Sequence, residues 1–297
     1  MSAETELEAD IAAALQEAER LAASVPGLAL KPPRPSSERA GVHRARRAGA
    51  GYDFWQHRPY AAGDAPTSID WRRSAKSDAG LLVRDRERET AAGLAAWIDP
   101  SASMAYRDRG PVSKRRRALE LALAFAEAAA RSGEPVSLLA NGPARRISGR
   151  GAAAELAGEF RTQKDTPPAR PLPGAATVLI ASDFFFDRTQ IEPFVLACAE
   201  RGLAGVFLAV NDPSETALGL SGRVEIEDVE GGPRLKLEAA NALKSAYDAA
   251  FEENLKGVAD LAARAGWRLI ATRTDEPAEA AFRELTAHLA APLRGGA

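Results

Sequence analysis

Residues 94–104 read Leu94-Ala95-Ala96-Trp97-Ile98-Asp99-Pro100-Ser101-Ala102-Ser103-Met104, and structural and chemical signals coincide in this stretch. Its first five residues are apolar, which predicts a short buried strand that ends at Ile98. Residues 113–132 then have helical periodicity, and the helix is expected to stop at Gly133, because glycine favours helix ends. A strand, a polar loop and a helix therefore follow one another here.

The same alternation continues to about residue 290. Strands are expected at 136–140, 177–181, 205–210 and 267–271, and helices at 152–162, 191–201, in a long stretch closed by Gly266, and at 277–290. A small hairpin is expected over 224–226 and 235–237. Strands that alternate with helices build a mostly parallel sheet covered on both faces. Residues 91–290 are therefore predicted to form an α/β domain that binds ligands beyond the carboxyl ends of its strands.

Two segments precede this domain. Residues 1–37 are expected to form an amphipathic helix over 4–23, followed by a Pro-rich linker. Residues 38–90 are rich in Arg and aromatic side chains and are expected to form a small β-rich segment. Within that segment, Asp70-Trp71-Arg72 is expected to clamp the segment onto the main sheet, with Trp71 mostly buried.

Composition limits the class of protein. Of 297 residues, 45% are hydrophobic and 27% charged, with a net charge of −2, as in an ordinary globular protein. The acidic start lacks the order of a signal peptide, and no apolar run approaches the roughly 20 residues that cross a bilayer. These features predict a cytoplasmic chain without a membrane span. The single cysteine, Cys198, lies in an apolar stretch and is expected to be a buried, inert thiol.

The loop after the first strand has the pattern D-x-S-x-S. Asp99, Ser101 and Ser103 offer a carboxylate and two hydroxyls on one tight loop, a donor set that suits a hard cation such as Mg²⁺. Asp183 ends the next strongly apolar strand and is expected to share the same ion. The alternative is that Asp99 and Ser101 only cap the segment that follows them.

A basic run, Lys114-Arg115-Arg116-Arg117, opens the next helix, where cations oppose the helix dipole. Helix stability therefore does not explain the run. It is expected either to form a positive rim that attracts an acidic partner, or to be an ordinary solvated face.

Two weaker patterns have structural interpretations. Residues 31–90 carry 13 Lys and Arg against 8 Asp and Glu, with aromatic residues interleaved, which leaves nucleic-acid binding open as an alternative. We expect instead a lattice of Arg–carboxylate pairs and no nucleic-acid partner. Residues 149–154 imitate a G-x-G-x-x-A dinucleotide turn, but no strand ending in an acid follows at the required spacing, so a plain turn is expected.

Several of these stretches resemble a known family. They are Gly51-Tyr52-Asp53-Phe54, Arg58-Pro59-Tyr60, Gly63-Asp64, Ile69-Asp70-Trp71-Arg72, the Asp99 motif, Ser182-Asp183-Phe184 and Thr272-Arg273-Thr274-Asp275-Glu276-Pro277. Over residues of about 40 to 285 the chain resembles the bacterial family called domain of unknown function 58. The order strand, D-x-S-x-S-M, helix, strand, Ser-Asp also resembles the metal-ion-dependent adhesion site of von Willebrand factor A domains, which have a Rossmann-like fold.

The resemblance implies a protein-binding module that acts with a MoxR-type AAA+ ATPase in assembling or activating a client. Adhesion sites also take a Thr from an intervening loop, and Thr162 and Thr166 are the candidates here, neither in a recognisable context. The metal site is therefore expected either to be a complete adhesion-type site or to be a remnant of one that lacks the Thr. A metal-dependent hydrolase using Asp99 and Asp183 is the enzymatic alternative, but no general base accompanies these acids, so we expect no enzyme.

Overall fold

The computed structural model describes residues 3–25, 27–31, 54–59, 70–74, 80–86, 93–139, 144–164, 166–216, 224–226, 235–237 and 244–290. They belong to two compact units, Met1–Pro35 with Ala92–Ala297, and Ser36–Ala91. The first unit is the α/β unit. It includes the N-terminal helix, which the sequence set apart as a separate segment.

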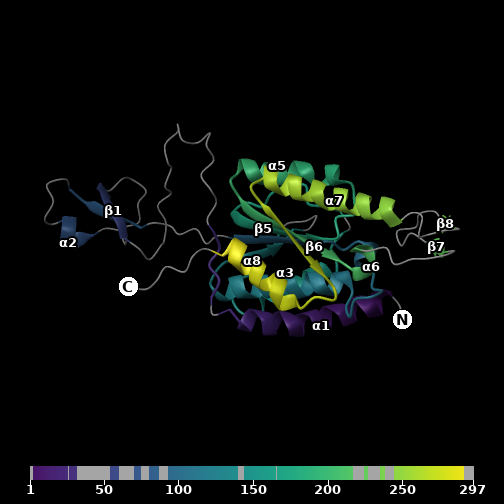
Figure 1. The fold of residues 1–297 in the computed structure, drawn as a ribbon. Helices are drawn as coiled ribbons and strands as arrows, with labels where there is room; N and C mark the ends of the chain where they lie inside the picture. Colours follow the sequence, from purple (N-terminus) through teal and green to yellow (C-terminus); the bar gives the residue numbers. More distant parts are fainter. Residues whose placement is uncertain are drawn as a thin grey trace. The chain divides into compact units, whose positions relative to one another are not determined.

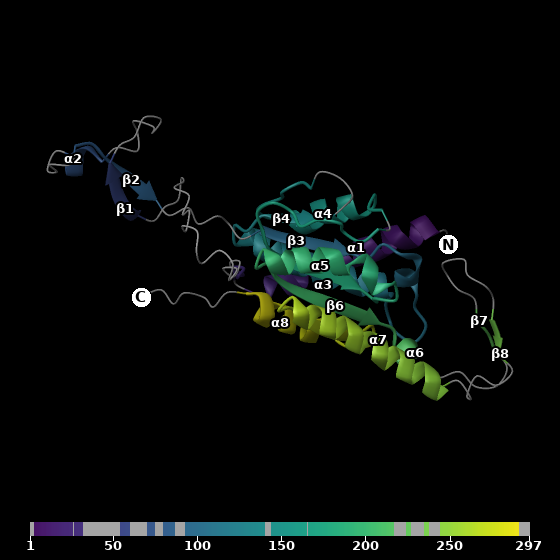
Figure 2. The same cartoon turned by 90° about the horizontal axis from the view of Figure 1, so that it is seen from above.

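The α/β unit is built on a five-stranded parallel sheet in the order β4-β3-β5-β6-β9 (Figures 1 and 2). Its strands are β3 (Gly93–Ile98), β4 (Val136–Leu138), β5 (Ala175–Ser182), β6 (Ala204–Asn211) and β9 (Arg268–Arg273). The register pairs Ile98 with Ala181, and Asn211 with Arg273. The loops that follow β3, β5, β6 and β9 therefore emerge together at the carboxyl edge of the sheet.

Helices cover both faces of this sheet, as predicted. They are α1 (Ala3–Ala23), α3 (Lys114–Arg131), α4 (Ala152–Phe160), α5 (Glu192–Glu200), α7 (Lys244–Arg264) and α8 (Ala278–Leu289). Alternate strand residues point to opposite faces, so Ala96 and Ile98 pack with α1, α3, α4 and α8, whereas Ala95 and Trp97 pack with α5 and α7. The apolar runs are continuous because both faces are buried.

Helix α1 forms a further layer on α3 (Figure 1). Its stripe of Ile11, Ala14, Ala18 and Leu21 is fully buried. Helix α3 is consequently enclosed between α1 and the sheet, which explains why Ala residues dominate its sequence: small side chains let both neighbours approach closely.

The shorter elements of the α/β unit are η3 (Ala102–Ala105), η4 (Arg188–Gln190), α6 (Pro213–Thr216), β7 (Val224–Ile226) and β8 (Leu235–Leu237). The antiparallel pairing of β7 with β8 confirms the predicted hairpin. Ile147 forms a single antiparallel bridge with Val136. No described helix is long and apolar enough to cross a membrane.

In the turn at residues 149–154, which imitates a dinucleotide-binding motif, a side chain of the same chain takes the place that a phosphate would need. Gly149 and Gly151 both have positive φ, and α4 begins directly after Gly151. The buried carboxylate of Glu127, on α3, accepts hydrogen bonds from the backbone N–H groups of Gly151 (3.1 Å) and Ala153 (3.0 Å). This helix N-terminus already holds an internal anion, which supports the prediction of a plain turn.

In the second unit, β1 (Phe54–Pro59) pairs antiparallel with β2 (Leu82–Arg86), and α2 (Trp71–Ser74) lies between them in sequence. The Asp70 carboxylate accepts a hydrogen bond from Arg73 N and so caps α2. Trp71 is 63% exposed, so this unit alone does not bury it. The predicted clamp of Asp70-Trp71-Arg72 onto the main sheet stays a prediction. Arg58 lies in β1 opposite Val83, while Gly63 and Asp64 lie outside the described residues.

A pair of glycines tests the packing of the sheet. A Cβ added at Gly205, in β6, would lie 2.3 Å from the Trp267 ring, whose Nε1 is tied to Leu203 O. Gly205→Ala should therefore lower the free energy of unfolding by about 1–3 kcal/mol. Gly158→Ala is the control, because its Cβ would meet nothing closer than 4.0 Å on the helix α4.

This control should raise stability by up to about 1 kcal/mol, since Ala is the better helix former. Urea unfolding of both variants measures the two effects. A neutral Gly205→Ala would contradict the close packing of Trp267 on β6.

Candidate functional site

Asp99, the first residue after β3, joins the ends of two neighbouring strands. Its carboxylate accepts hydrogen bonds from Ser101 N (2.9 Å) and from Ser182 Oγ at the end of β5 (2.5 Å), and its backbone N–H donates to Ala181 O. The side chain is buried, and burial raises its pKa against the opposing effect of these hydrogen bonds.

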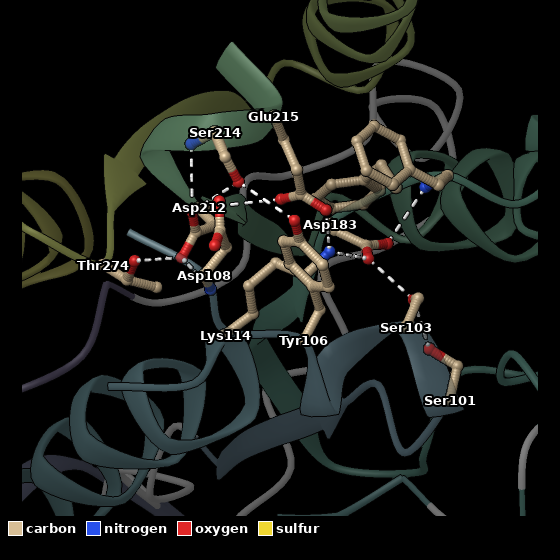
Figure 3. A network of polar contacts seen from close by, with 12 residues as sticks. Ser101, Ser103, Tyr106, Asp108, Lys114, Asp183, Asp212, Ser214, Glu215 and Thr274 are labelled. Atoms are coloured by element: carbon tan, nitrogen blue, oxygen red, sulfur yellow. Dashed lines mark hydrogen bonds and ion pairs between the residues drawn. The ribbon is translucent and has the colours of Figure 1, made fainter. Parts of the chain in front are cut away.

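The two serines connect this loop to Asp183. Ser101 Oγ and Ser103 Oγ are 3.1 Å apart, and Ser103 Oγ donates to Asp183 Oδ2 at 2.7 Å (Figure 3). The other oxygen of Asp183 accepts from Phe185 N. All four residues predicted as metal ligands, Asp99, Ser101, Ser103 and Asp183, therefore come together at the carboxyl edge of the sheet.

Lys114 enters the same cluster from the start of α3. Its ammonium lies 2.7 Å from Asp183 Oδ2 and 2.5 Å from Glu215 Oε1, and its side chain is 0% exposed (Figure 3). The Phe185 and Tyr106 rings lie beside it, with centroids 5.0 and 5.6 Å from Nζ, within cation–π range. A buried ammonium is thus held between two carboxylates and two aromatic rings.

Glu215 was overlooked in the sequence, although a signal for it exists. The stretch Asp212-Pro213-Ser214-Glu215 is a capping box that opens α6: Asp212 Oδ1 accepts from Ser214 N, and Glu215 Oε2 accepts from Asp212 N. Burial raises the pKa of Glu215, and the Lys114 ammonium opposes that shift. The capping box therefore fixes Glu215 where its second oxygen meets Lys114.

Asp212 also organises the loop that leads into α3. Its carboxylate accepts hydrogen bonds from the N–H groups of Asp108, Arg109 and Gly110, and Thr274 Oγ1 lies 3.3 Å away. Burial works against the charged form, but hydrogen bonds from Ser214, Gly110 and Arg109 hold the pKa of Asp212 well below its usual range. The loop from η3 to α3 is thus anchored to the end of β6.

The other basic residues of the run point elsewhere. Arg115 pairs with Asp10 on α1, Arg116 pairs with Glu120 within α3, and Arg117 donates to backbone carbonyls of the loop between β9 and α8. The expected exposed rim is wrong for Lys114, Arg115 and Arg117, which are buried. Tertiary ion pairs of Lys114 and Arg115, together with the pairs that Arg116 and Arg117 form with Glu120 inside α3, offset the unfavourable helix dipole.

Beside the buried cluster, one aromatic side chain is exposed. Phe184 has φ 57°, a left-handed conformation that is strained for a bulky residue, and its carbonyl accepts a hydrogen bond from Asn254 Nδ2. The next residue, Phe185, is 44% exposed while its ring lies over Lys114. This turn holds an apolar ring at the surface of the site.

The residues do not fit a Mg²⁺ ion as they stand. The two serine hydroxyls are engaged with each other and with Asp183, and the cationic place beside Asp183 Oδ2 is taken by Lys114. Within the described residues no cluster of three or more His, Cys, Asp or Glu side chains could hold a metal. Thr162 and Thr166 are both exposed, and Thr162 Oγ1 donates to Glu159 O within its own turn.

The thiol of Cys198 is buried, as predicted, and burial raises its pKa to about 12. It therefore stays protonated and takes no part in the chemistry of the site.

A parallel sheet covered on both faces, with a polar cluster at its carboxyl edge, defines an α/β protein. The chain belongs to the family described as protein of unknown function DUF58, whose pattern matches residues 56–256. No curated protein matches it.

Two solved structures are similar over most of their own length. The conserved hypothetical protein BatB of Bacteroides thetaiotaomicron is 15% identical, with a TM-score of 0.35 over 66% of this chain and 96% of BatB. An aerotolerance-related membrane protein of Bacteroides fragilis is 12% identical, with a TM-score of 0.40 over 66% of this chain and 98% of that protein.

Neighbouring arginines on α3 test the role of the basic run. Arg117→Ala should lower the free energy of unfolding by about 2–3 kcal/mol, because it leaves Glu120 and several carbonyls without their buried donor. Arg116→Ala removes a partly exposed pair and should cost less than about 1 kcal/mol. Equal effects of the two substitutions in thermal or urea unfolding would contradict this assignment.

The lowered pKa of Asp212 should make the stability of the folded protein depend on pH. Its pKa is lower in the folded protein than its ordinary value of 3.8, so its stabilising contribution is complete above that value and is lost as pH falls below it. Asp212→Asn should cost about 2 kcal/mol at neutral pH and progressively less in acid.

Asp108→Asn is the control for this effect, because the Asp108 side chain is exposed on the same loop. Urea unfolding between neutral and acid pH measures both variants. A difference between Asp212→Asn and the wild type that stays constant with pH would show that the carboxylate charge is not what matters.

Proposed function

We propose that this chain is a protein-binding module with a von Willebrand factor A-like domain, and that it acts with a MoxR-type AAA+ ATPase on a protein client. The observation that carries the proposal is the contrast at the carboxyl edge of the sheet. The acids and the lysine there are paired with one another, whereas Phe185 beside them is exposed. A reacting group needs access to substrate, while an exposed aromatic ring on a rigid base suits docking.

The domain assignment is supported by the order of the parts. The D-x-S-x-S loop follows β3, and Asp183 follows β5, the strand paired with β3. This is the arrangement that the resemblance to adhesion-type domains implies. The link to a MoxR-type ATPase comes from the resemblance alone.

The edge also favours a partner of a particular chemistry. Arg107 and Arg109 are exposed on the loop that Asp212 anchors, and the same loop carries Tyr106, which lies beside Lys114. An edge that presents an exposed apolar ring and exposed arginines suits a partner surface that offers an apolar pocket with acidic residues at its rim.

Binding to the MoxR-type AAA+ ATPase of the same genome tests the proposal. The purified ATPase is immobilised in the presence of an ATP analogue. Phe185→Ala should then raise the dissociation constant by about 10-fold or more, as expected for the loss of a central aromatic anchor. Arg268→Ala is the control, since it alters an exposed side chain at the amino end of β9, the opposite edge of the sheet. Surface plasmon resonance measures all three proteins.

Failure of the wild-type chain to bind the ATPase would overturn the proposed partnership. Equal binding by wild type and Phe185→Ala would remove Phe185 from the interface.

A further inference from the structure

We infer that Lys114 is the permanent cation of this adhesion-type site and that Glu215 is its internal carboxylate ligand, so that the site works without a divalent metal. The inference rests on the proposed function only in taking the site as adhesion-type. It goes further, because it assigns the place of the metal and the place of the partner's acid to two side chains of this chain.

The position of Lys114 is fixed by its backbone. Ser113 caps α3 by accepting a hydrogen bond from Arg116 N, and Lys114 N donates to the carbonyl of Tyr106, the residue that directly follows η3. The first residue of α3 therefore faces the end of β5. A lysine with no exposed surface requires counter-charges within reach, because burying an unpaired ammonium is prohibitively unfavourable.

One oxygen of Asp183 serves both the loop and the lysine. Asp183 Oδ2 accepts from Ser103 Oγ and from Lys114 Nζ, each at 2.7 Å. In an adhesion site the cation would join the serine hydroxyls to this carboxylate. Here Ser103 bonds to Asp183 directly, and the positive charge on the carboxylate comes from the ammonium.

Glu215 approaches the ammonium from a separate element. Its Oε1 lies 2.5 Å from Lys114 Nζ, its Oε2 accepts from Asp212 N at 2.8 Å, and its backbone carbonyl accepts from Tyr247 Oη at 2.9 Å. Glu215 is therefore held rigidly in the place that an acid from a partner would take on a metal. A partner carboxylate could contact Lys114 only by displacing Glu215.

The remaining directions around the ammonium are closed by aromatic rings. Tyr106 and Phe185 both lie within cation–π distance of Nζ. A Mg²⁺ ion demands near-octahedral oxygen ligands at about 2.0–2.1 Å and usually keeps several waters. Rings and a buried ammonium offer neither, and a second cation beside Lys114 would be repelled. Partner recognition at this edge is accordingly expected to be insensitive to chelators.

Mn²⁺ is the probe for the test, because its electron paramagnetic resonance signal reports binding directly. The wild-type chain should not bind Mn²⁺ at this site, and its melting temperature should not change with Mn²⁺ or with EDTA. Lys114→Ala removes the cation but leaves Asp183 and Glu215 facing the vacated space. It should bind Mn²⁺ at least about 10-fold more tightly than the wild type, and Mn²⁺ should raise its melting temperature, because carboxylate oxygens are hard ligands.

Three further variants locate the effect. Lys114→Arg keeps the positive charge and should not bind Mn²⁺. Arg116→Ala removes a charge from the same turn of α3 without touching the site and should behave as the wild type. Adding Asp183→Asn to Lys114→Ala should abolish the gained binding.

Tight Mn²⁺ binding by the wild-type chain that is lost in Asp183→Asn would overturn the inference, and this comparison decides the matter even if Lys114→Ala does not fold. A folded Lys114→Ala that binds Mn²⁺ no better than the wild type would also overturn it. No partner is present in these titrations, so a failure to bind the ATPase leaves their outcome unaffected.

Discussion

The buried ion pairs of Lys114 with Asp183 and Glu215 connect three separate parts of the carboxyl edge. Lys114 begins α3, Asp183 directly follows β5, and Glu215 lies in α6 after β6. An ammonium without access to water is stable only when it is paired with an opposite charge. The geometry of the D-x-S-x-S loop therefore depends on this contact, because Ser103 bonds to the same oxygen of Asp183 that Lys114 uses.

The loops around this contact are held by the same physical means. The Asp212 carboxylate accepts hydrogen bonds from N–H groups of the loop before α3, and the Arg117 guanidinium donates hydrogen bonds to carbonyls at the end of β9 and in the loop after it. In each case a buried charge satisfies several backbone groups that no strand or helix could satisfy. Gly110 completes this packing, since an added Cβ would overlap Thr274 Oγ1. The result is a rigid edge from which Phe185 projects.

The sequence predicted the sheet and its site in outline, because those features depend on local patterns. Apolar runs that alternate with helical periodicity located β3, β5 and β6, and parallel strands bring their carboxyl ends together, so Asp99 and Asp183 were expected near each other. The partners of the basic run were beyond such reasoning. Lys114 is 69 residues from Asp183 and 101 from Glu215, and no periodicity relates them.

A crystal structure of the wild-type chain grown with saturating MnCl₂ tests the central claim most directly, because anomalous scattering identifies manganese without ambiguity. The account predicts Lys114 Nζ within hydrogen-bonding distance of Asp183 and Glu215 and no anomalous peak among the serines. A manganese peak coordinated by Ser101, Ser103 and Asp183, with Lys114 turned away, would contradict it.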